Sequence, residues 1–219
     1  MPALKNTTIA AICRFAVGVA VFALVMHTWF VMGLLVPVTV AGSSMAPILQ
    51  GPRECYRCEA CQREFAIGVD QLAAVDPICP DCGNWSEIVR LGPQRGERIL
   101  VDRTAFLLRR PRRWEIAVFR TPHDVNELCV KRIVGLPGEV VSLVDGHLLI
   151  GCQSLEGRFG NLWELRPGDD PRLREGWQLG PTEYFVLGDN GAISDDSRSW
   201  STGPGIDEKL LVGRPIGVR

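Results

Sequence analysis

The sequence predicts a mainly β protein, in which an antiparallel β domain follows one N-terminal transmembrane helix and is interrupted by a small cysteine-rich insertion. Three observations predict this arrangement. Residues 15–36 are almost continuously apolar. Residues 92–219 contain short runs of β-branched and aromatic residues bounded by Gly and Pro, without a long run of helical periodicity. Residues 51–91 hold five of the eight cysteines.

The apolar segment is long enough to cross the ~30 Å hydrocarbon core of a bilayer as a helix. Basic residues flank its N-terminal end at Lys5 and Arg14, and the next one along the chain is Arg53. The positive-inside rule therefore predicts a single-pass anchor over residues 1–36, with the N-terminus inside and the rest of the chain outside. A cleaved secretory signal is one alternative, but the apolar stretch exceeds the ~7–15 residues usual for such signals. A buried core helix is another, and the missing polar face argues against it.

Beyond the anchor, we expect residues 37–50 and 92–219 to form the β domain and residues 51–91 to form the insertion. The domain is expected to be a folded antiparallel sheet or small barrel. Asp145-Gly146 suits a tight hairpin turn between two of its strands. Residues 151–181, rich in Gly, Arg and Pro, are expected to be irregular. The predicted strands are residues 99–101, 116–119, 128–134, 140–144, 147–150 and 184–187.

The charge balance favours no particular polyanion as a partner. The formal net charge is −1, so the sequence predicts no nucleic-acid partner. Four arginines cluster at Arg109, Arg110, Arg112 and Arg113. A solvated face is the simplest interpretation of this cluster, and contact with anionic lipid headgroups is the alternative.

Two local sequences carry candidate chemistry. Residues 42–47 read Gly-Ser-Ser-Met-Ala-Pro, and Lys131 opens the run Lys-Arg-Ile-Val-Gly-Leu-Pro-Gly. A serine hydroxyl needs a base within hydrogen-bond reach to act as a nucleophile, and a buried lysine can be that base. Strand alternation places Lys131 on one face between Cys129 and Ile133, two apolar neighbours. The alternative is a lysine that extends to solvent from the end of a strand.

A third local sequence completes a pattern. Residues 188–190 read Gly-Asp-Asn, and residues 194–200 read Ser-Asp-Asp-Ser-Arg-Ser-Trp. In this order after an anchor, the three sequences resemble those of the bacterial type I signal peptidases, over residues 37–50 and about 92–219. The resemblance implies a membrane-bound serine endopeptidase that removes signal peptides from secreted preproteins at the outer face of the bacterial cytoplasmic membrane. It also implies substrates with small residues at positions −1 and −3, and no catalytic cofactor.

The resemblance assigns roles to individual residues. Ser44 would be the nucleophile, because it directly precedes the Met-x-Pro, and Lys131 would be the general base. The backbone N–H of Ser44 is the first candidate oxyanion donor, and Gly42 stands where some members carry a serine hydroxyl as a second donor. Ser194 would hydrogen-bond the lysine. The pair that would brace the site is Asp196 and Arg198.

The third local sequence also departs from the family pattern. Residues 191–193 read Gly-Ala-Ile where a polar run is usual, and Ser201 replaces a glycine. A catalytically silent module that recruits a partner through the insertion is therefore kept as an alternative. A related Ser/Lys self-cleaving regulator is a further rival, but such proteins lack the anchor and the third local sequence.

The cysteines of the insertion have the spacing of a zinc ribbon. Two Cys-x-x-Cys pairs, Cys58 with Cys61 and Cys79 with Cys82, predict a closed structural Zn²⁺ site. Cys55 is an alternative ligand. Disulfides are a competing interpretation, because the insertion is expected outside the cytoplasm, where they form readily; free thiols are a third. In ordinary signal peptidases the segment between the serine sequence and the β region is short, so the insertion is not part of the family pattern.

Overall fold

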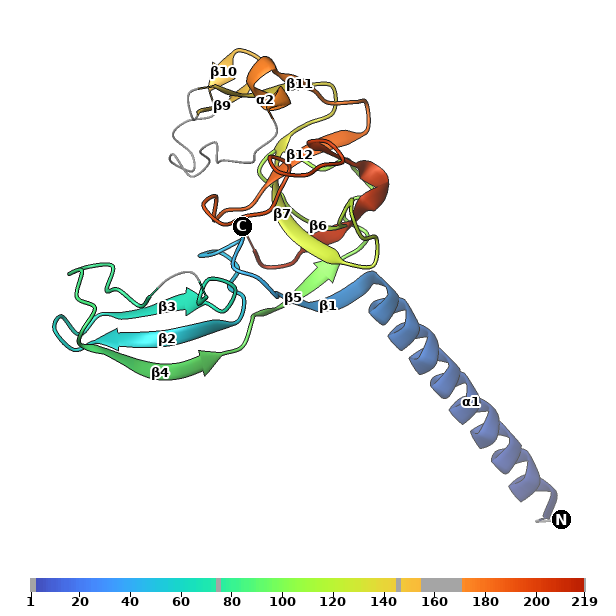
Figure 1. Cartoon of the computed structure of the whole chain (residues 1–219). Coiled ribbons are helices and arrows are strands. Elements are labelled where there is room, and N and C mark those ends of the chain that lie inside the picture. Colours follow the sequence, from blue (N-terminus) through green and yellow to red (C-terminus); the bar gives the residue numbers. More distant parts are fainter. Residues whose placement is uncertain (1–2, 74–75, 145–146, 155–170, 219) are drawn as a thin grey trace. The chain divides into compact units, whose positions relative to one another are not determined.

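The computed structural model of the chain describes residues 3–73, 76–144, 147–154 and 171–218. The chain divides into two compact units, Met1–Val36 and Pro37–Arg219. Figure 1 traces the helix of the first unit and the sheets of the second.

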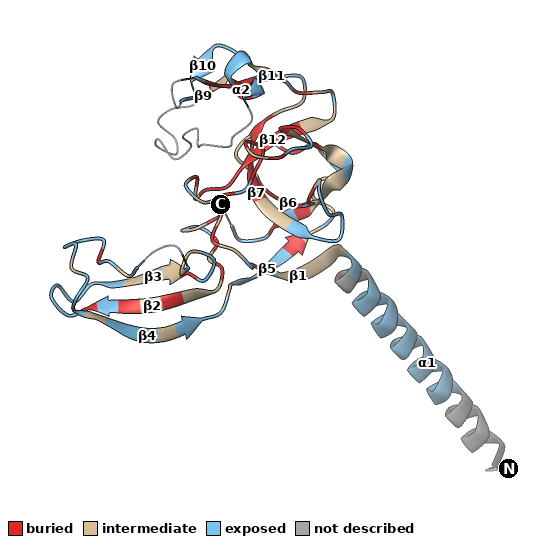
Figure 2. Ribbon diagram, in the orientation of Figure 1, coloured by how far each residue is buried: buried red, intermediate tan, exposed pale blue. Residues whose placement is uncertain are grey.

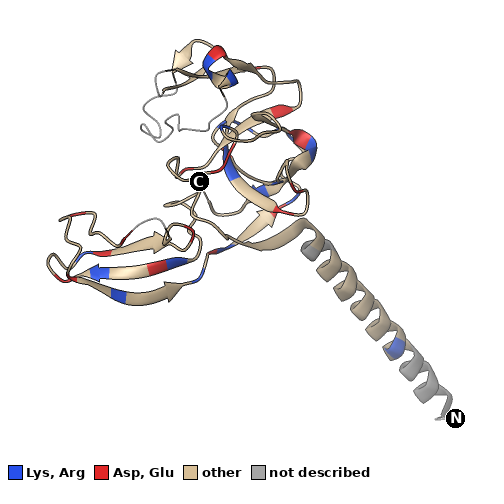
Figure 3. Cartoon of the chain, in the orientation of Figure 1, with Lys and Arg blue, Asp and Glu red and all other residues tan. Residues whose placement is uncertain are grey.

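Helix α1 spans Ala3–Leu34 and makes up most of the first unit. Its segment Ile12–Trp29 is long and apolar enough to cross a membrane, by length and composition. Arg14 is the one Asp, Glu, Lys or Arg within that segment. Figure 3 shows the described part of the helix almost entirely in the tan of residues without charge. All side chains of the segment are exposed, so no internal core explains their apolar character. The single apolar helix expected near the N-terminus is therefore present.

The described residues of the second unit form three antiparallel sheets, which confirms the predicted mainly β fold. The largest has the strand order β1-β5-β14-β6-β7-β12-β13. Its strands are β1 Leu35–Thr39, β5 Arg98–Asp102, β6 Ile116–Arg120, β7 Leu128–Gly135, β12 Glu183–Leu187, β13 Gly205–Asp207 and β14 Leu211–Pro215. A 3-10 helix, η1 Glu208–Leu210, connects β13 to β14. Strands β6, β7 and β12 lie side by side in the interior of this sheet, and β7 carries Lys131.

The second sheet has the order β10-β9-β8-β11. Its elements, with the short helix next to it, are β8 Val140–Val144, β9 His147–Ile150, β10 Gln153–Ser154, α2 Arg172–Glu175 and β11 Trp177–Gln178. β8 and β9 pair as the expected hairpin, with Val144 opposite His147. The predicted turn residues 145–146 lie outside the described residues, as do residues 155–170.

The described parts of the region 151–181, residues 151–154 and 171–181, are more regular than the sequence indicates. They contribute β10, α2 and β11, and Leu173 and Leu179 are buried against the core. An isolated Leu in a segment rich in Gly and Pro gives no periodic signal, so its burial against a distant sheet cannot be read from local sequence.

Among the residues that the structure describes, three apolar clusters form the core of the second unit, and Figure 2 shows the central strands β6, β7 and β12 largely as buried. One joins β7, β8 and β12 around Phe185. A second lies beneath residues 40–49 and contains Met45 and Leu49. The third surrounds Ile133 and takes in Trp200, which packs edge-on against Phe119 at a ring distance of 6.0 Å. The second and third clusters support two segments that carry candidate site residues.

The insertion forms the third sheet, of order β3-β2-β4. Its strands are β2 Arg53–Cys58, β3 Glu64–Gly68 and β4 Ile88–Gln94. Tyr56 of β2 stacks on Phe65 of β3 at a ring distance of 5.7 Å. The sequence of the insertion has little strand periodicity, and β4 continues beyond residue 91, where we expected the insertion to end. This small sheet relies on hydrogen-bonded pairing and one aromatic contact more than on a wide apolar face.

Candidate active site and cysteine cluster

The turn at residues 43–46 presents Ser44. The carbonyl oxygen of Ser43 accepts a hydrogen bond from the backbone N–H of Ala46 at 3.1 Å. Met45 and Leu49 anchor the turn in the apolar cluster beneath it, each contributing on the order of 1.5–3 kcal/mol by burial. Ser44 itself is half-buried. Its hydroxyl and its backbone N–H make no hydrogen bond with any residue that the structure describes.

Lys131 lies on β7 opposite Ala117 of β6 and is 2% exposed. Its strand neighbours Cys129 and Ile133 both belong to the apolar cluster around Trp200, in keeping with the expected alternation. The Nζ of Lys131 donates a hydrogen bond to the Oγ of Ser194 at 3.0 Å. The amine is therefore held inside the protein rather than extended to solvent.

The segment 194–198 forms a buried polar network behind this lysine. The hydroxyl of Ser194 also forms a hydrogen bond with the carboxylate of Asp196. Both carboxylate oxygens of Asp196 accept hydrogen bonds from Arg198, from Nε and from Nη2, each at 2.9 Å. Burial opposes ionisation of Asp196, but the hydrogen bond and charge of Arg198, together with hydrogen bonds from Ser194 and Gly188, hold the pKa of this carboxyl below its ordinary value. A chain of contacts thus runs from Lys131 through Ser194 and Asp196 to Arg198.

Residues 188–190 connect this network to the serine turn. The backbone N–H of Asn190 donates to the carbonyl oxygen of Ser44 at 2.9 Å, and its side-chain amide donates to the carbonyl oxygen of Ser43 at 3.3 Å. A Cβ on Gly188 would lie 2.2 Å from the Oγ of Ser194 and 2.5 Å from the carbonyl oxygen of Ser44. Only glycine fits there, because the Ser44 turn and the segment that carries Ser194 both lie directly against this position.

Asp189 has a structural partner on β7. Its carboxylate accepts two hydrogen bonds from Arg132, each at 2.7 Å, and both side chains are buried. Strand alternation turns Arg132 to the face opposite Lys131, so this pair braces β7 without touching the lysine.

The candidate residues are therefore brought together in part. Lys131 contacts Ser194, and Ser194, Asp196 and Arg198 form one network. Ser44 reaches that network through backbone contacts with residues 188–190, and no hydrogen bond joins it to Lys131 among the described residues. Gly42 is half-buried, and a Cβ there would make an ordinary contact of 3.5 Å with a carboxylate oxygen of Asp70.

Sequence reasoning missed the contacts of residues 189 and 190, because Gly-Asp-Asn after a strand is also an ordinary turn. The available signal was its position directly after the buried strand β12, where a polar residue is carried to the end of the sheet. Sequence reasoning also missed Asp70, which bonds Ser43 from within the insertion.

The four cysteines with ribbon spacing lie together. The sulfur atoms of Cys58, Cys61, Cys79 and Cys82 are all within 4.8 Å of one another. The Sγ atoms of Cys58 and Cys82 are 3.6 Å apart, and those of Cys61 and Cys79 are 3.5 Å apart. A disulfide would need about 2.05 Å. All eight cysteines are free, so the disulfide alternative is not realised in this structure.

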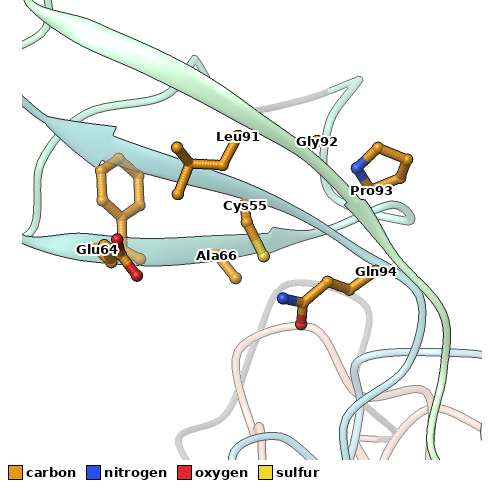
Figure 4. A pocket seen from close by; sticks show the side chains of 8 residues that line it. Cys55, Glu64, Ala66, Leu91, Gly92, Pro93 and Gln94 are labelled. Carbon is orange, nitrogen blue, oxygen red and sulfur yellow. The ribbon is translucent and has the colours of Figure 1, made fainter.

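Cys55 does not belong to this group. It lies three residues before Cys58 on β2 and lines a pocket of about 390 Å³ on the insertion, to which Phe65 also contributes. Figure 4 shows Cys55 between Ala66 and Leu91. No residue of the serine turn lines this pocket.

Ser44 is half-buried on a turn that contacts residues 188–190, and the buried Lys131 bonds Ser194. Serine and lysine are the pair of residues used by serine hydrolases with a lysine base. The sequence model of the family described as "Signal peptidase, peptidase S26" matches residues 91–216. The chain therefore belongs to the signal peptidase S26 family.

Two curated sequence relatives agree with this assignment. The chain is 31% identical over 128 residues to signal peptidase I of Leptolyngbya laminosa, a match that covers 55% of this chain and 58% of the relative. It is 34% identical to signal peptidase I V of Bacillus subtilis, covering 55% and 73%. A crystal structure of a signal peptidase I from Enterococcus faecalis V583 aligns at 27% identity and a TM-score of 0.39, covering 48% of this chain and 97% of that one. The chain spans about half the length of the curated relatives it matches first.

Proposed function

We propose that this chain is a membrane-anchored serine endopeptidase that removes signal peptides from secretory preproteins, with Ser44 as nucleophile and Lys131 as general base. The observation that carries the proposal is the buried Lys131 amine, 3.0 Å from the Ser194 hydroxyl in a network that contacts the Ser44 turn. Membership of the S26 family supports the same activity.

In the proposed reaction, the Oγ of Ser44 attacks the scissile carbonyl carbon while its proton passes to the Nζ of Lys131. That proton then goes to the amine of the departing mature protein, which leaves an acyl-enzyme. Lys131 next deprotonates a water molecule that hydrolyses the ester, and the proton returns to Ser44. The backbone N–H of Ser44, unpaired among the described residues, is the proposed donor to the oxyanion.

Ser194 is proposed to orient the amine of Lys131, and Asp196 with Arg198 to fix Ser194. The hydroxyl of Ser44 and the amine of Lys131 would complete their contact with substrate bound, because catalytic hydrogen bonds are often long or misaligned in free enzymes and tighten in the complex.

The proposed substrates are preproteins with small residues at positions −1 and −3, as the family resemblance implies. The proposed orientation has the N-terminus inside and the β domain outside, on the basis of Lys5 and Arg14. Lipid contact by the β domain is supported by Leu107 and Leu108, which are 80% and 87% exposed. In the neighbouring cluster of four arginines, two form ion pairs within the protein: Arg109 with Glu115 and Arg113 with Glu139.

The test is cleavage of a preprotein with an Ala-x-Ala site by the detergent-solubilised chain. We expect a cut after the second alanine, and Ser44→Ala and Lys131→Met should each lower the rate at least about a hundredfold. Ser86→Ala and Lys209→Met are matched controls, because both side chains are exposed and lie outside the site. A folded wild type that cuts no preprotein would instead favour the silent binding module.

We also propose that the four grouped cysteines bind a structural Zn²⁺. A tetrahedral site with Zn–S bonds of about 2.3 Å needs sulfurs roughly 3.8 Å apart, and the spacing of the thiols fits that requirement. Four protein ligands leave no open position, so the metal would stabilise the insertion and take no part in the cleavage.

Metal analysis of the purified chain should find one zinc per chain. Cys82→Ser should lose it and lower the melting temperature, whereas Cys55→Ser should keep it, because Cys55 lies outside the group. Loss of zinc from the Cys55 variant alone would assign the ligands differently.

A further inference from the structure

The serine turn has a second polar contact, which comes from the insertion. The backbone N–H of Ser43 donates to Oδ2 of Asp70 at 2.9 Å, and the hydroxyl of Ser43 donates to Oδ1 of the same carboxylate at 2.7 Å. Ser43 is 5% exposed, so both of its donors are satisfied by one residue that lies 27 positions later. A carboxylate with both oxygens engaged fixes the orientation as well as the position of its partner.

The chain around the Ser43–Asp70 contact is packed so closely that two glycines there could not carry a side chain. A Cβ on Gly68 would lie 1.9 Å from the Oγ of Ser43 and 2.5 Å from Oδ1 of Asp70. A Cβ on Gly51 would lie 2.5 Å from the carbonyl oxygen of Gly42. The beginning and the middle of the insertion therefore lie directly against the segment that leads into Ser44.

Asp70 is itself held in place by the insertion. It follows β3 in a turn in which the backbone N–H of Gln71 donates to the carbonyl oxygen of Gly68 at 2.9 Å. The N–H of Val69 donates to the carbonyl oxygen of Pro52, also at 2.9 Å. Gly68 pairs with Arg53 at the start of β2, whereas Cys58 of the cysteine group stands at the end of that strand. Cys58 of the cysteine group and Asp70 thus lie at opposite ends of the β2–β3 hairpin.

We infer that Asp70 is a positioning residue for the nucleophile: by holding the N–H and hydroxyl of Ser43, it fixes the turn on which Ser44 stands. Asn190 donates hydrogen bonds to the carbonyl oxygens of Ser43 and Ser44, so Asp70 and Asn190 fix the turn from two sides. The contact also commits the N–H of Ser43 to Asp70, so of the N–H groups of the two serines only that of Ser44 is left for the oxyanion. This inference rests on the proposed peptidase function.

Asp70→Ala in the full-length solubilised chain tests the inference. Loss of two hydrogen bonds to a carboxylate should lower kcat about tenfold or more, with KM within about twofold of wild type because Asp70 does not touch the substrate. Asp70→Asn keeps one acceptor oxygen and should lose less than Asp70→Ala. Glu64→Gln is the matched control, since Glu64 is an exposed carboxylate of the same hairpin paired with Arg57, and it should cleave as wild type does.

Three results would overturn the inference: a kcat of Asp70→Ala within about twofold of wild type, a rise in KM without a fall in kcat, or equal losses in Asp70→Ala and Glu64→Gln. If Asp70→Ala does not fold, Asp70→Asn and Ser43→Ala carry the same comparison, because each removes part of the contact. Inactive wild type and Glu64→Gln would mean that the peptidase proposal fails. Active wild type with an unaffected Asp70→Ala would mean that only the positioning role fails.

Discussion

The serine turn is supported from two sides that differ in burial. On the interior side, Asp196 and Arg198 form an ion pair in which neither side chain is exposed, and Asn190 links this region to the turn. On the insertion side, Asp70 is an exposed carboxylate that bonds a buried serine. A buried charge depends on its partner because water cannot replace it, whereas an exposed carboxylate is solvated with or without one. We therefore expect loss of the interior ion pair to lower the stability of the fold, and loss of the insertion contact to change the geometry of the serine turn.

Removing the interior arginine should have the largest effect. Arg198→Met leaves the carboxylate of Asp196 buried without its cation, and we expect the free energy of unfolding to fall by about 3–5 kcal/mol. Urea denaturation of the solubilised chain, followed by circular dichroism, measures it. Arg57→Met is the insertion-side control: its pair with Glu64 is exposed, so the loss should stay below about 1 kcal/mol.

A double variant sharpens this interpretation. Asp196→Asn combined with Arg198→Met removes the buried charge together with its partner, and should be less destabilising than Arg198→Met alone. Equal losses in Arg198→Met and Arg57→Met would contradict the contrast between the two sides.

The close approach on the insertion side gives an intermediate effect. Gly68→Ala should cost about 1–3 kcal/mol, because its Cβ would overlap the Ser43 side chain. In a Ser43→Gly background the overlapping atoms of residue 43 are gone, so the same substitution should cost clearly less. Denaturation of the single and double variants completes the cycle, and an identical cost in both backgrounds would place the strain elsewhere.

The contacts that sequence could predict are those within a segment or within a recognised pattern. The strands around Lys131 follow from runs of β-branched residues between Gly and Pro. The pairing of Asp196 with Arg198 is local, two residues apart, and the family resemblance indicated Ser194 as the partner of the lysine. Each of these expectations depends on information that lies within a short stretch of chain.

The contacts that sequence could not predict join segments far apart. Asp70 stands in an insertion that the family pattern does not cover, and nothing near it in sequence indicates that it faces Ser43. The same holds for Asn190, whose amide reaches back 147 positions to the carbonyl oxygen of Ser43. Such contacts depend on how separate elements pack, which a reading by local propensity does not capture.

Of these changes, acidification should give the smallest difference between the insertion side and the interior side of the serine turn. Hydrogen bonding and attraction from Arg90 hold the pKa of Glu54, in the insertion, below its ordinary value of 4.5, although its partial desolvation acts in the opposite direction. Burial acts to raise the pKa of Asp196, but Arg198, with Ser194 and Gly188, lowers it below the ordinary value of 3.8. A lowered pKa in the folded state means that each carboxylate stabilises the fold fully above its ordinary value, and that this contribution is lost as the pH falls further, through the folded-state pKa.

The insertion should therefore begin to loosen near pH 4.5, and the interior only below about pH 3.8. Hydrogen exchange of peptides from β2 and β4, compared with peptides covering residues 183–200, measures both regions on one sample, once the rates are corrected for intrinsic exchange. Glu54→Gln removes the titrating carboxylate and should flatten the response of the insertion, leaving that of the interior unchanged. If the interior loosened first on acidification, the buried Asp196–Arg198 pair would be the weaker of the two supports, and the division between folding and positioning would be reversed.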